Sequence, residues 1–148
     1  MKSSLKLLML AGVLGAGLLT LHAADKKHLG GPKGGRILEK TEPEAEFYVE
    51  QDHSISIAFY DAAAKPTAAT DQTVTVIADT KGGKQTVEFE KKGGLLVSKT
   101  KLPAGDGYNL VVQFKQTAAA KPKNFRFKLE LHTCGGCQRA EYSCICDH

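Results

Sequence analysis

The residues with the clearest chemical potential lie at the end of the 148-residue chain, where all four of its cysteines are gathered. Cys134 and Cys137 flank a Gly-Gly pair. After six further residues come Cys144, Cys146 and His148. A two-residue gap lets the chain fold back so that both sulfurs reach one ion, and glycine permits the positive φ that such a knuckle often needs. The second group alternates, so an extended tail would project all three of its side chains toward that knuckle. This spacing predicts a metal site.

The donors in this tail are soft or borderline ligands. Tetrahedral Zn²⁺ needs four of them, and the thiols with one imidazole offer five. Thiolates also suit Cu(I), so the donor types alone leave the choice between the two metals open. The terminal carboxylate is a further candidate donor, whereas His132, at the end of a predicted strand, is more often solvated. The prediction is one bound ion, Zn²⁺ or Cu(I), with ligands drawn from Cys134, Cys137, Cys144, Cys146 and His148.

The amino terminus predicts export. Basic residues precede an uncharged run at residues 7–21 that is rich in Leu, Gly and Ala, and the small pair Ala23 and Ala24 follows. This is the three-part plan of a secretory signal peptide. The run is interrupted by glycines and is shorter than the roughly 20 residues that a membrane-spanning helix needs. We predict that residues 1–24 are a cleaved signal peptide, that the mature protein has no membrane span, and that it is periplasmic or secreted.

Disulfide bonds are the alternative interpretation of the same cysteines. An exported chain meets an oxidising compartment, where an even number of cysteines ordinarily forms bridges. A bond between Cys144 and Cys146 is geometrically awkward, so oxidation would pair Cys134 and Cys137 crosswise with these two and clamp the tail. A redox-active Cys-Gly-Gly-Cys pair is a third interpretation, but it lacks the helix start or basic neighbours that would lower the pKa of its first thiol.

The part of the chain that must position this tail shows alternation and no helical apolar stripe. In the clearest run, Phe125, Phe127, Leu129 and Leu131 fall on one face and charged residues on the other, as in a half-buried antiparallel strand. Eight such runs are candidate strands, at residues 36–40, 45–50, 54–60, 73–78, 85–90, 95–99, 108–114 and 125–131. Turn-forming residues separate them. The prediction is one all-β domain at residues 25–131, an antiparallel β-sandwich or small barrel, followed by a Cys/His metal-binding tail at residues 132–148.

Charge and motifs exclude several classes of function. The formal charge of +4 falls to +2 when the two lysines of the predicted signal peptide are removed, and tryptophan is absent. A nucleic-acid partner is therefore not expected, because it would require a strong basic patch with interleaved aromatic residues. The chain contains no Gly-x-Ser-x-Gly and no His-Glu-x-x-His motif. The acidic group Glu42, Glu44 and Glu46 is interpreted as a solvated strand edge, so the protein is predicted not to be an enzyme.

The segment from His28 to Glu39, with its Gly-Gly-Pro-Lys-Gly-Gly core, is followed by Glu-Phe-Tyr-Val-Glu at residues 46–50 and by a strand and loop at residues 55–66. Together these resemble the opening β-domain of periplasmic adaptor subunits of heavy-metal efflux systems. The resemblance covers residues 28–66 only and includes neither the other adaptor modules nor the cysteine tail. It implies a stand-alone exported domain with a periplasmic efflux component as partner. The predicted role is metal sequestration, delivery or sensing; the alternative is a structural or protein-interaction domain locked by two disulfides.

Overall fold

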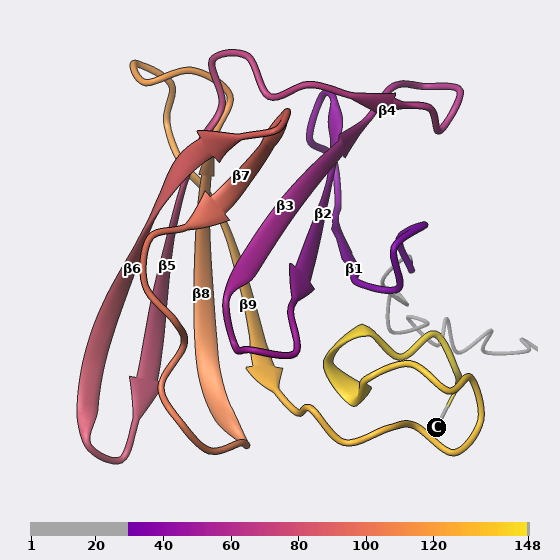
Figure 1. The fold of residues 1–148 in the computed structure, drawn as a ribbon, viewed down its shortest axis with the longest axis vertical. Coiled ribbons are helices and arrows are strands. Elements are labelled where there is room, and N and C mark those ends of the chain that lie inside the picture. Colours follow the sequence, from indigo (N-terminus) through magenta and orange to yellow (C-terminus); the bar gives the residue numbers. More distant parts are fainter. Residues whose placement is uncertain (1–29, 148) are drawn as a thin grey trace, which may run out of the picture.

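The computed structural model describes residues 30–147, which form one antiparallel sheet of nine strands (Figure 1). The order across the sheet is β1-β2-β3-β7-β6-β5-β8-β9, and β4 pairs with β3 outside this path. The sheet curls into a nearly closed barrel, which confirms the predicted antiparallel all-β class. The strands are β1 (Arg36–Leu38), β2 (Glu44–Val49), β3 (Ile55–Tyr60), β4 (Pro66–Thr67), β5 (Thr73–Thr80), β6 (Gly83–Lys92), β7 (Leu95–Ser98), β8 (Tyr108–Lys115) and β9 (Lys123–Leu129). A single-turn 3-10 helix, η1 (Glu141–Ser143), follows in the tail.

All eight predicted strands are present, with shifted ends. The last one ends at Leu129 because the chain leaves the sheet there to begin the tail, although Leu131 still packs against the core. β4 has only two residues, too few to produce an alternating pattern. The predicted signal peptide, residues 1–24, and the candidate ligand His148 lie outside the described residues. Within residues 30–147, no helix combines the length and apolar character needed to cross a membrane.

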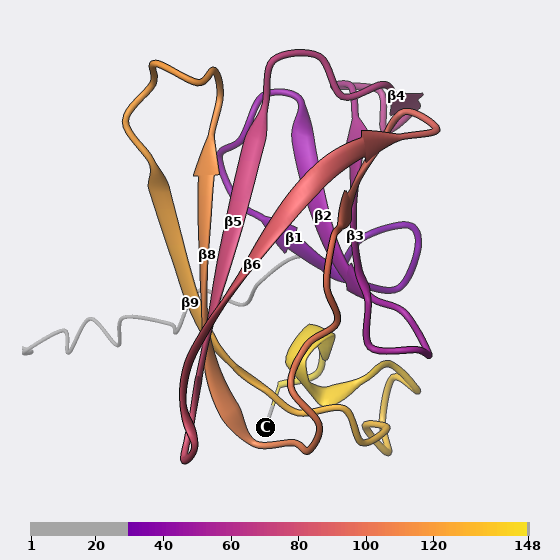
Figure 2. The same ribbon diagram turned by 60° about the vertical axis from the view of Figure 1, so that its left-hand side comes forward.

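The hydrophobic core lies inside the barrel, between the β1–β3 side and the β5–β8–β9 side (Figure 2). β6 joins the two sides, because its residues 83–88 pair with β5 and its residues 89–92 pair with β7. Alternation places the apolar side chains inward, as on β8, where every second residue is buried. The largest fully buried apolar side chains are Phe47, Phe59, Phe114, Leu38, Ile55, Ile57, Leu110 and Leu129.

The outer face of β2 and β3 is covered by residues 30–35, here called the glycine loop. Glu46 points to this face and is fully buried. Its carboxylate accepts hydrogen bonds from the backbone N–H groups of Lys33 (3.0 Å) and Gly35 (2.7 Å). The hydroxyl of Tyr60 donates a third bond at 2.8 Å, and burial together with this bond raises the pKa of Tyr60 to about 12. Glu46 thus holds the glycine loop against the barrel.

The burial of Glu46 corrects the prediction of a solvated acidic edge. Glu42 and Glu44 are exposed, but Glu46 is 0% exposed. Alternation shows that such residues share a face, and it does not show that a loop from elsewhere covers part of that face. Glycine is required for this covering, because a Cβ atom on Gly31 would lie 2.1 Å from Cδ of Glu46.

The two ends of the barrel carry different segments. The turn between β2 and β3 and the cysteine tail lie at one end (Figure 1). The loops that follow β3 and β8, at residues 61–65 and 116–122, lie at the opposite end and are largely exposed. The four cysteines therefore gather at a single end of the molecule.

Candidate metal centre

The tail is anchored in the core by Tyr142. This side chain is 4% exposed and packs against Phe47 and Phe127, with ring centroids 6.0 Å and 6.3 Å away. Its hydroxyl accepts a hydrogen bond from the backbone N–H of Val49 at 3.0 Å. A buried aromatic ring of this kind contributes both apolar area and a polar contact. The tail is therefore a part of the folded barrel, and the cysteines on either side of η1 take fixed positions from it.

The glycine loop provides a second anchor for the tail. The guanidinium of Arg139 donates hydrogen bonds to the carbonyl oxygens of Gly31 (3.1 Å) and Gly35 (3.4 Å). The hydroxyl of Ser143 donates to the carbonyl oxygen of Gly34 at 2.9 Å. Since the same loop is held by Glu46 on its other side, it lies between the barrel and the cysteine tail and connects them.

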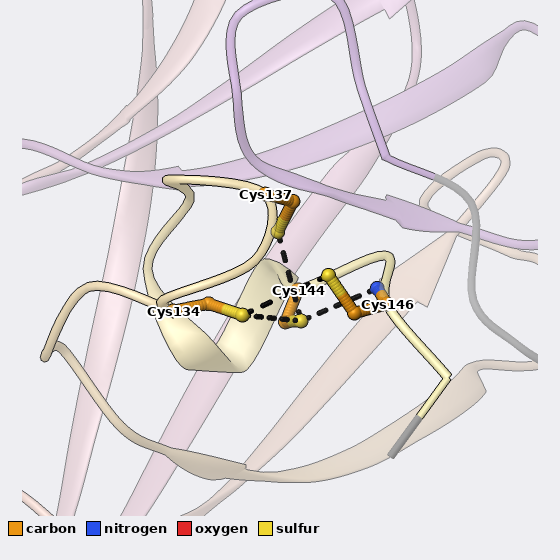
Figure 3. Close-up of side chains that lie close together, drawn as sticks. All are labelled: Cys134, Cys137, Cys144 and Cys146. Carbon is orange, nitrogen blue, oxygen red and sulfur yellow. Dashed lines mark hydrogen bonds between the residues drawn. The ribbon is translucent and has the colours of Figure 1, made fainter.

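The four cysteine sulfurs converge on one point (Figure 3), and all of them lie within 4.8 Å of one another. Sγ of Cys144 lies 3.1 Å from that of Cys134 and 3.6 Å from that of Cys137, and the Cys134–Cys146 distance is 3.8 Å. A tetrahedral zinc site with Zn–S bonds of about 2.3 Å has sulfurs about 3.8 Å apart. The cluster therefore has the size that one ion needs. No two sulfurs are at the roughly 2.05 Å of a disulfide.

The knuckle at Cys134–Cys137 is closed by backbone hydrogen bonds. The N–H of Cys134 donates to the carbonyl oxygen of Arg139 (2.7 Å), and the N–H of Gln138 donates to that of Cys134 (3.1 Å). The positive φ of this turn, 60°, falls on Gln138, and neither glycine of the pair has a positive φ. The prediction that these glycines supply the positive φ of the knuckle is therefore wrong. Gly136 is needed because it has no side chain: a Cβ atom there would lie 2.6 Å from Sγ of Cys146.

Backbone N–H groups point at two of the sulfurs. The N–H of Cys146 donates to Sγ of Cys144 at 3.3 Å. Hydrogen bonds from the N–H groups of Ile145 and Arg139 lower the pKa of Cys137 to about 6. The pKa of Cys144 rises to about 12. The hydrogen bond from the N–H of Cys146 acts to lower this pKa, but hydrogen bonding with Cys134, burial and hydrogen bonding with the other two thiols raise it by more. Without a cation, thiols this close cannot all ionise, so Cys137 takes the negative charge while Cys144 keeps its proton.

The cluster has a covered side and an open side. Cys134 and Cys144 are buried, whereas Cys137 and Cys146 are partly exposed. His132 is exposed, and its Nε2 atom lies 4.0 Å from a carboxylate oxygen of Glu141. Of the histidines in the part of the chain that the structure describes, none joins the sulfur cluster.

The sequence pattern identified the sulfurs but not the residues that place them. Arg139, Tyr142 and Ser143 hold the tail through partners about 100 positions earlier in the chain, which no local spacing reveals. The one available signal was Tyr142, in a tail whose other large apolar residue is Ile145, because tyrosine is often largely buried. Comparisons with protein-family models, curated proteins and solved structures find no match. The geometry of the cluster is therefore the basis for assigning a function.

Proposed function

We propose that the chain binds one metal ion through Cys134, Cys137, Cys144 and Cys146, and that this ion is Zn²⁺. The observation that carries the proposal is the convergence of four sulfurs at spacings close to those of a tetrahedral site. Both Zn²⁺ and Cu(I) accept thiolates, but a tetrahedral set of four sulfurs is typical of zinc or iron. A single ion without bridging sulfide fits sulfurs that all lie within 4.8 Å.

The backbone around the sulfurs supports an ionic site. A thiol is a weak hydrogen-bond acceptor, whereas a thiolate accepts strongly and is the form that binds metal. The backbone N–H of Cys146 points at the sulfur of Cys144, and two further N–H groups point at Cys137. These donors would offset part of the negative charge that remains when four thiolates bind one divalent ion.

Partial exposure supports a site that exchanges its ion. Cys137 and Cys146 are both reachable from solvent, so a competing ligand has access to two of the four metal–sulfur bonds. With the export and the resemblance to efflux adaptors that the sequence predicts, the role we propose is metal sequestration or delivery in the periplasm. The ion would also hold the tail folded, since all of its ligands lie on either side of η1.

Metal content and thiol count test this proposal together. Protein isolated without added reductant is expected to carry one ion per chain in native mass spectrometry, with zinc identified by elemental analysis. After denaturation and metal removal by a chelator, all four cysteines should react with a thiol reagent before any reduction. Copper in place of zinc would keep the site and change the ion. Protein with no metal and no reactive thiol until it is reduced would establish the two-disulfide clamp instead.

A methyl group beside the sulfurs gives a second test. In Gly136→Ala the new Cβ would lie 2.6 Å from Sγ of Cys146, so we expect that ligand to shift and metal affinity to fall about tenfold or more. Gly135→Ala is the matched control, because a Cβ at that position meets nothing within 4 Å. Competition with a coloured chelator measures both affinities. Equal affinities for the two variants would mean that Cys146 is not a ligand.

A further inference from the structure

The barrel is not closed between its first and last strands. β1 and β9 are the two ends of the strand order, and no pairing between them occurs among residues 30–147. Over the part of the chain that the structure describes, backbone hydrogen bonds join β9 to β8 on one side only, up to the point where the tail covers Glu130. The outer edge of β9 therefore presents unpaired N–H and C=O groups, which are a template for a further strand.

Two clefts follow this open edge. One, of about 360 Å³, lies between β1 and β9, and its lining includes Arg36, Lys40 and Arg126. The other, of about 370 Å³, continues from Lys40 past Phe114 toward the loop after β8. Lys40 lines both clefts, which lie one after the other along the seam and are here together called the seam groove. Between them the side chain of Lys123 crosses the seam and donates a hydrogen bond to the carbonyl oxygen of Lys40, so a bound segment would displace this contact. The far end of the seam groove is limited by Arg36, which donates a hydrogen bond to the carbonyl oxygen of Tyr142 in the tail.

The seam groove is basic. Five basic residues and no acidic residue stand between Asp106 and Glu130 in the sequence. Five basic side chains line the groove against two acidic ones, although the chain as a whole carries a formal charge of only +4. The basic residues are Arg36, Lys40, Lys121, Lys123 and Arg126, and the acidic residues are Glu39 and Glu42. Charge of one sign along a groove attracts a ligand of the opposite sign.

We propose that an extended acidic segment of a partner protein binds in the seam groove by adding a strand to the edge of β9. The unpaired backbone of β9 alternates N–H and C=O groups at the spacing of another strand, which the backbone of a peptide matches and that of a polynucleotide does not. The basic lining selects acidic side chains. This interaction goes beyond the proposed metal site and does not depend on it, since the groove contains none of the four cysteines.

The alternation of β9 defines the pattern of such a segment. Asn124, Arg126 and Lys128 point outward, and Phe125 and Phe127 point toward the core. Side chains directly opposite each other on paired strands lie on the same face. The added strand should therefore alternate, with acidic residues outward beside Arg126 and apolar residues inward over the phenylalanine side.

A labelled peptide of alternating Glu and Val residues is the probe, with the full chain, by fluorescence anisotropy. Binding should weaken steeply as salt rises, because the contacting charges lie at the surface. Two control peptides separate the contributions: one with Lys in place of every Glu, and one methylated on alternate backbone nitrogens. Each is expected to bind at least about tenfold more weakly than the probe. Hydrogen exchange with the bound probe should show protection gained at the amides of β9.

Variants locate the site. Lys121→Glu combined with Arg126→Glu should weaken probe binding about tenfold or more, while Lys91→Glu combined with Lys92→Glu, on β6, should leave it unchanged. All four positions are exposed, and circular dichroism verifies that both variants fold. The proposal is overturned if the probe does not bind, if the lysine or methylated peptide binds equally well, or if both double variants weaken it equally. Tighter binding of a single-stranded oligonucleotide that displaces the probe would make the groove a nucleic-acid site instead.

Discussion

Cys144→Ser is expected to reduce the bound metal from one ion per chain to none while the barrel stays folded. Cys144 is the central ligand of the cluster, since its sulfur lies 3.1 Å from that of Cys134 and 3.6 Å from that of Cys137. A serine hydroxyl is a poor substitute for a thiolate toward a soft or borderline ion. Binding of a structural zinc ion contributes roughly 10 kcal/mol or more, and this free energy depends on the complete set of ligands. Losing one of the four should therefore weaken binding enough to release the ion at ordinary concentrations.

Metal stoichiometry by elemental analysis and the thermal unfolding midpoint test this expectation together. Cys137→Ser should behave in the same way, and His132→Ala is the control that keeps the ion, because His132 lies outside the cluster. The barrel should remain folded in all three variants, since its buried core consists of strand residues together with Leu102 and Tyr142. A variant without Cys144 that retains one ion per chain would contradict the four-sulfur site. Global unfolding of that variant would contradict the expectation that the barrel folds without the ion.

Glu46→Gln is expected to lower the free energy of unfolding by about 3 kcal/mol. The side chain keeps its volume, but an amide offers one acceptor oxygen where the carboxylate offers two. The NH₂ group of the new amide must then face at least one of the three hydrogen-bond donors that the carboxylate now accepts from. These donors are the N–H groups of Lys33 and Gly35 and the hydroxyl of Tyr60. A buried donor left without its partner costs about 1 to 3 kcal/mol, and more where a charged group was the partner.

Glu44→Gln is the matched control, because this residue is on the same strand and is exposed. Its unfolding free energy should stay within about 0.5 kcal/mol of the original value. Urea denaturation followed by tyrosine fluorescence measures both variants. Metal affinity provides a second readout, since the glycine loop that Glu46 holds also accepts hydrogen bonds from Arg139 and Ser143 of the tail. If the two variants are equally stable, Glu46 does not anchor the loop.

The parts of this molecule that sequence reasoning predicted are those in which the cause is local. Alternation at Phe125, Phe127 and Leu129 reflects one strand with one buried face, and the spacing of the cysteines reflects ligands that reach one point from a short stretch of chain. Both patterns are complete within a few residues. For this reason the strands and the sulfur cluster could be predicted without the structure.

The parts that escaped prediction depend on contacts between distant segments. In the sequence, Glu46 looks like any outward strand residue, and only the structure shows that the glycine loop covers it. Tyr142 likewise looks like any tail residue, and only the structure shows that it packs against Phe47. The positive φ falls on Gln138, whose backbone N–H closes the knuckle by donating to the carbonyl oxygen of Cys134. Export, the nature of the ion and the link to efflux systems stay predictions.

The glycine loop and the cysteine tail lie against each other, and this contact determines where a tag or label can be attached to the protein. Gly30 lies so close to the tail that a Cβ atom there would be 2.7 Å from Cγ2 of Ile145, between the last two cysteines. A polyhistidine tag joined next to Gly30 or Asp147 would place imidazoles near the sulfurs, where they could compete for the ion. The exposed loop at residues 61–65 lies at the far end (Figure 1), so a label inserted there leaves the candidate metal centre undisturbed.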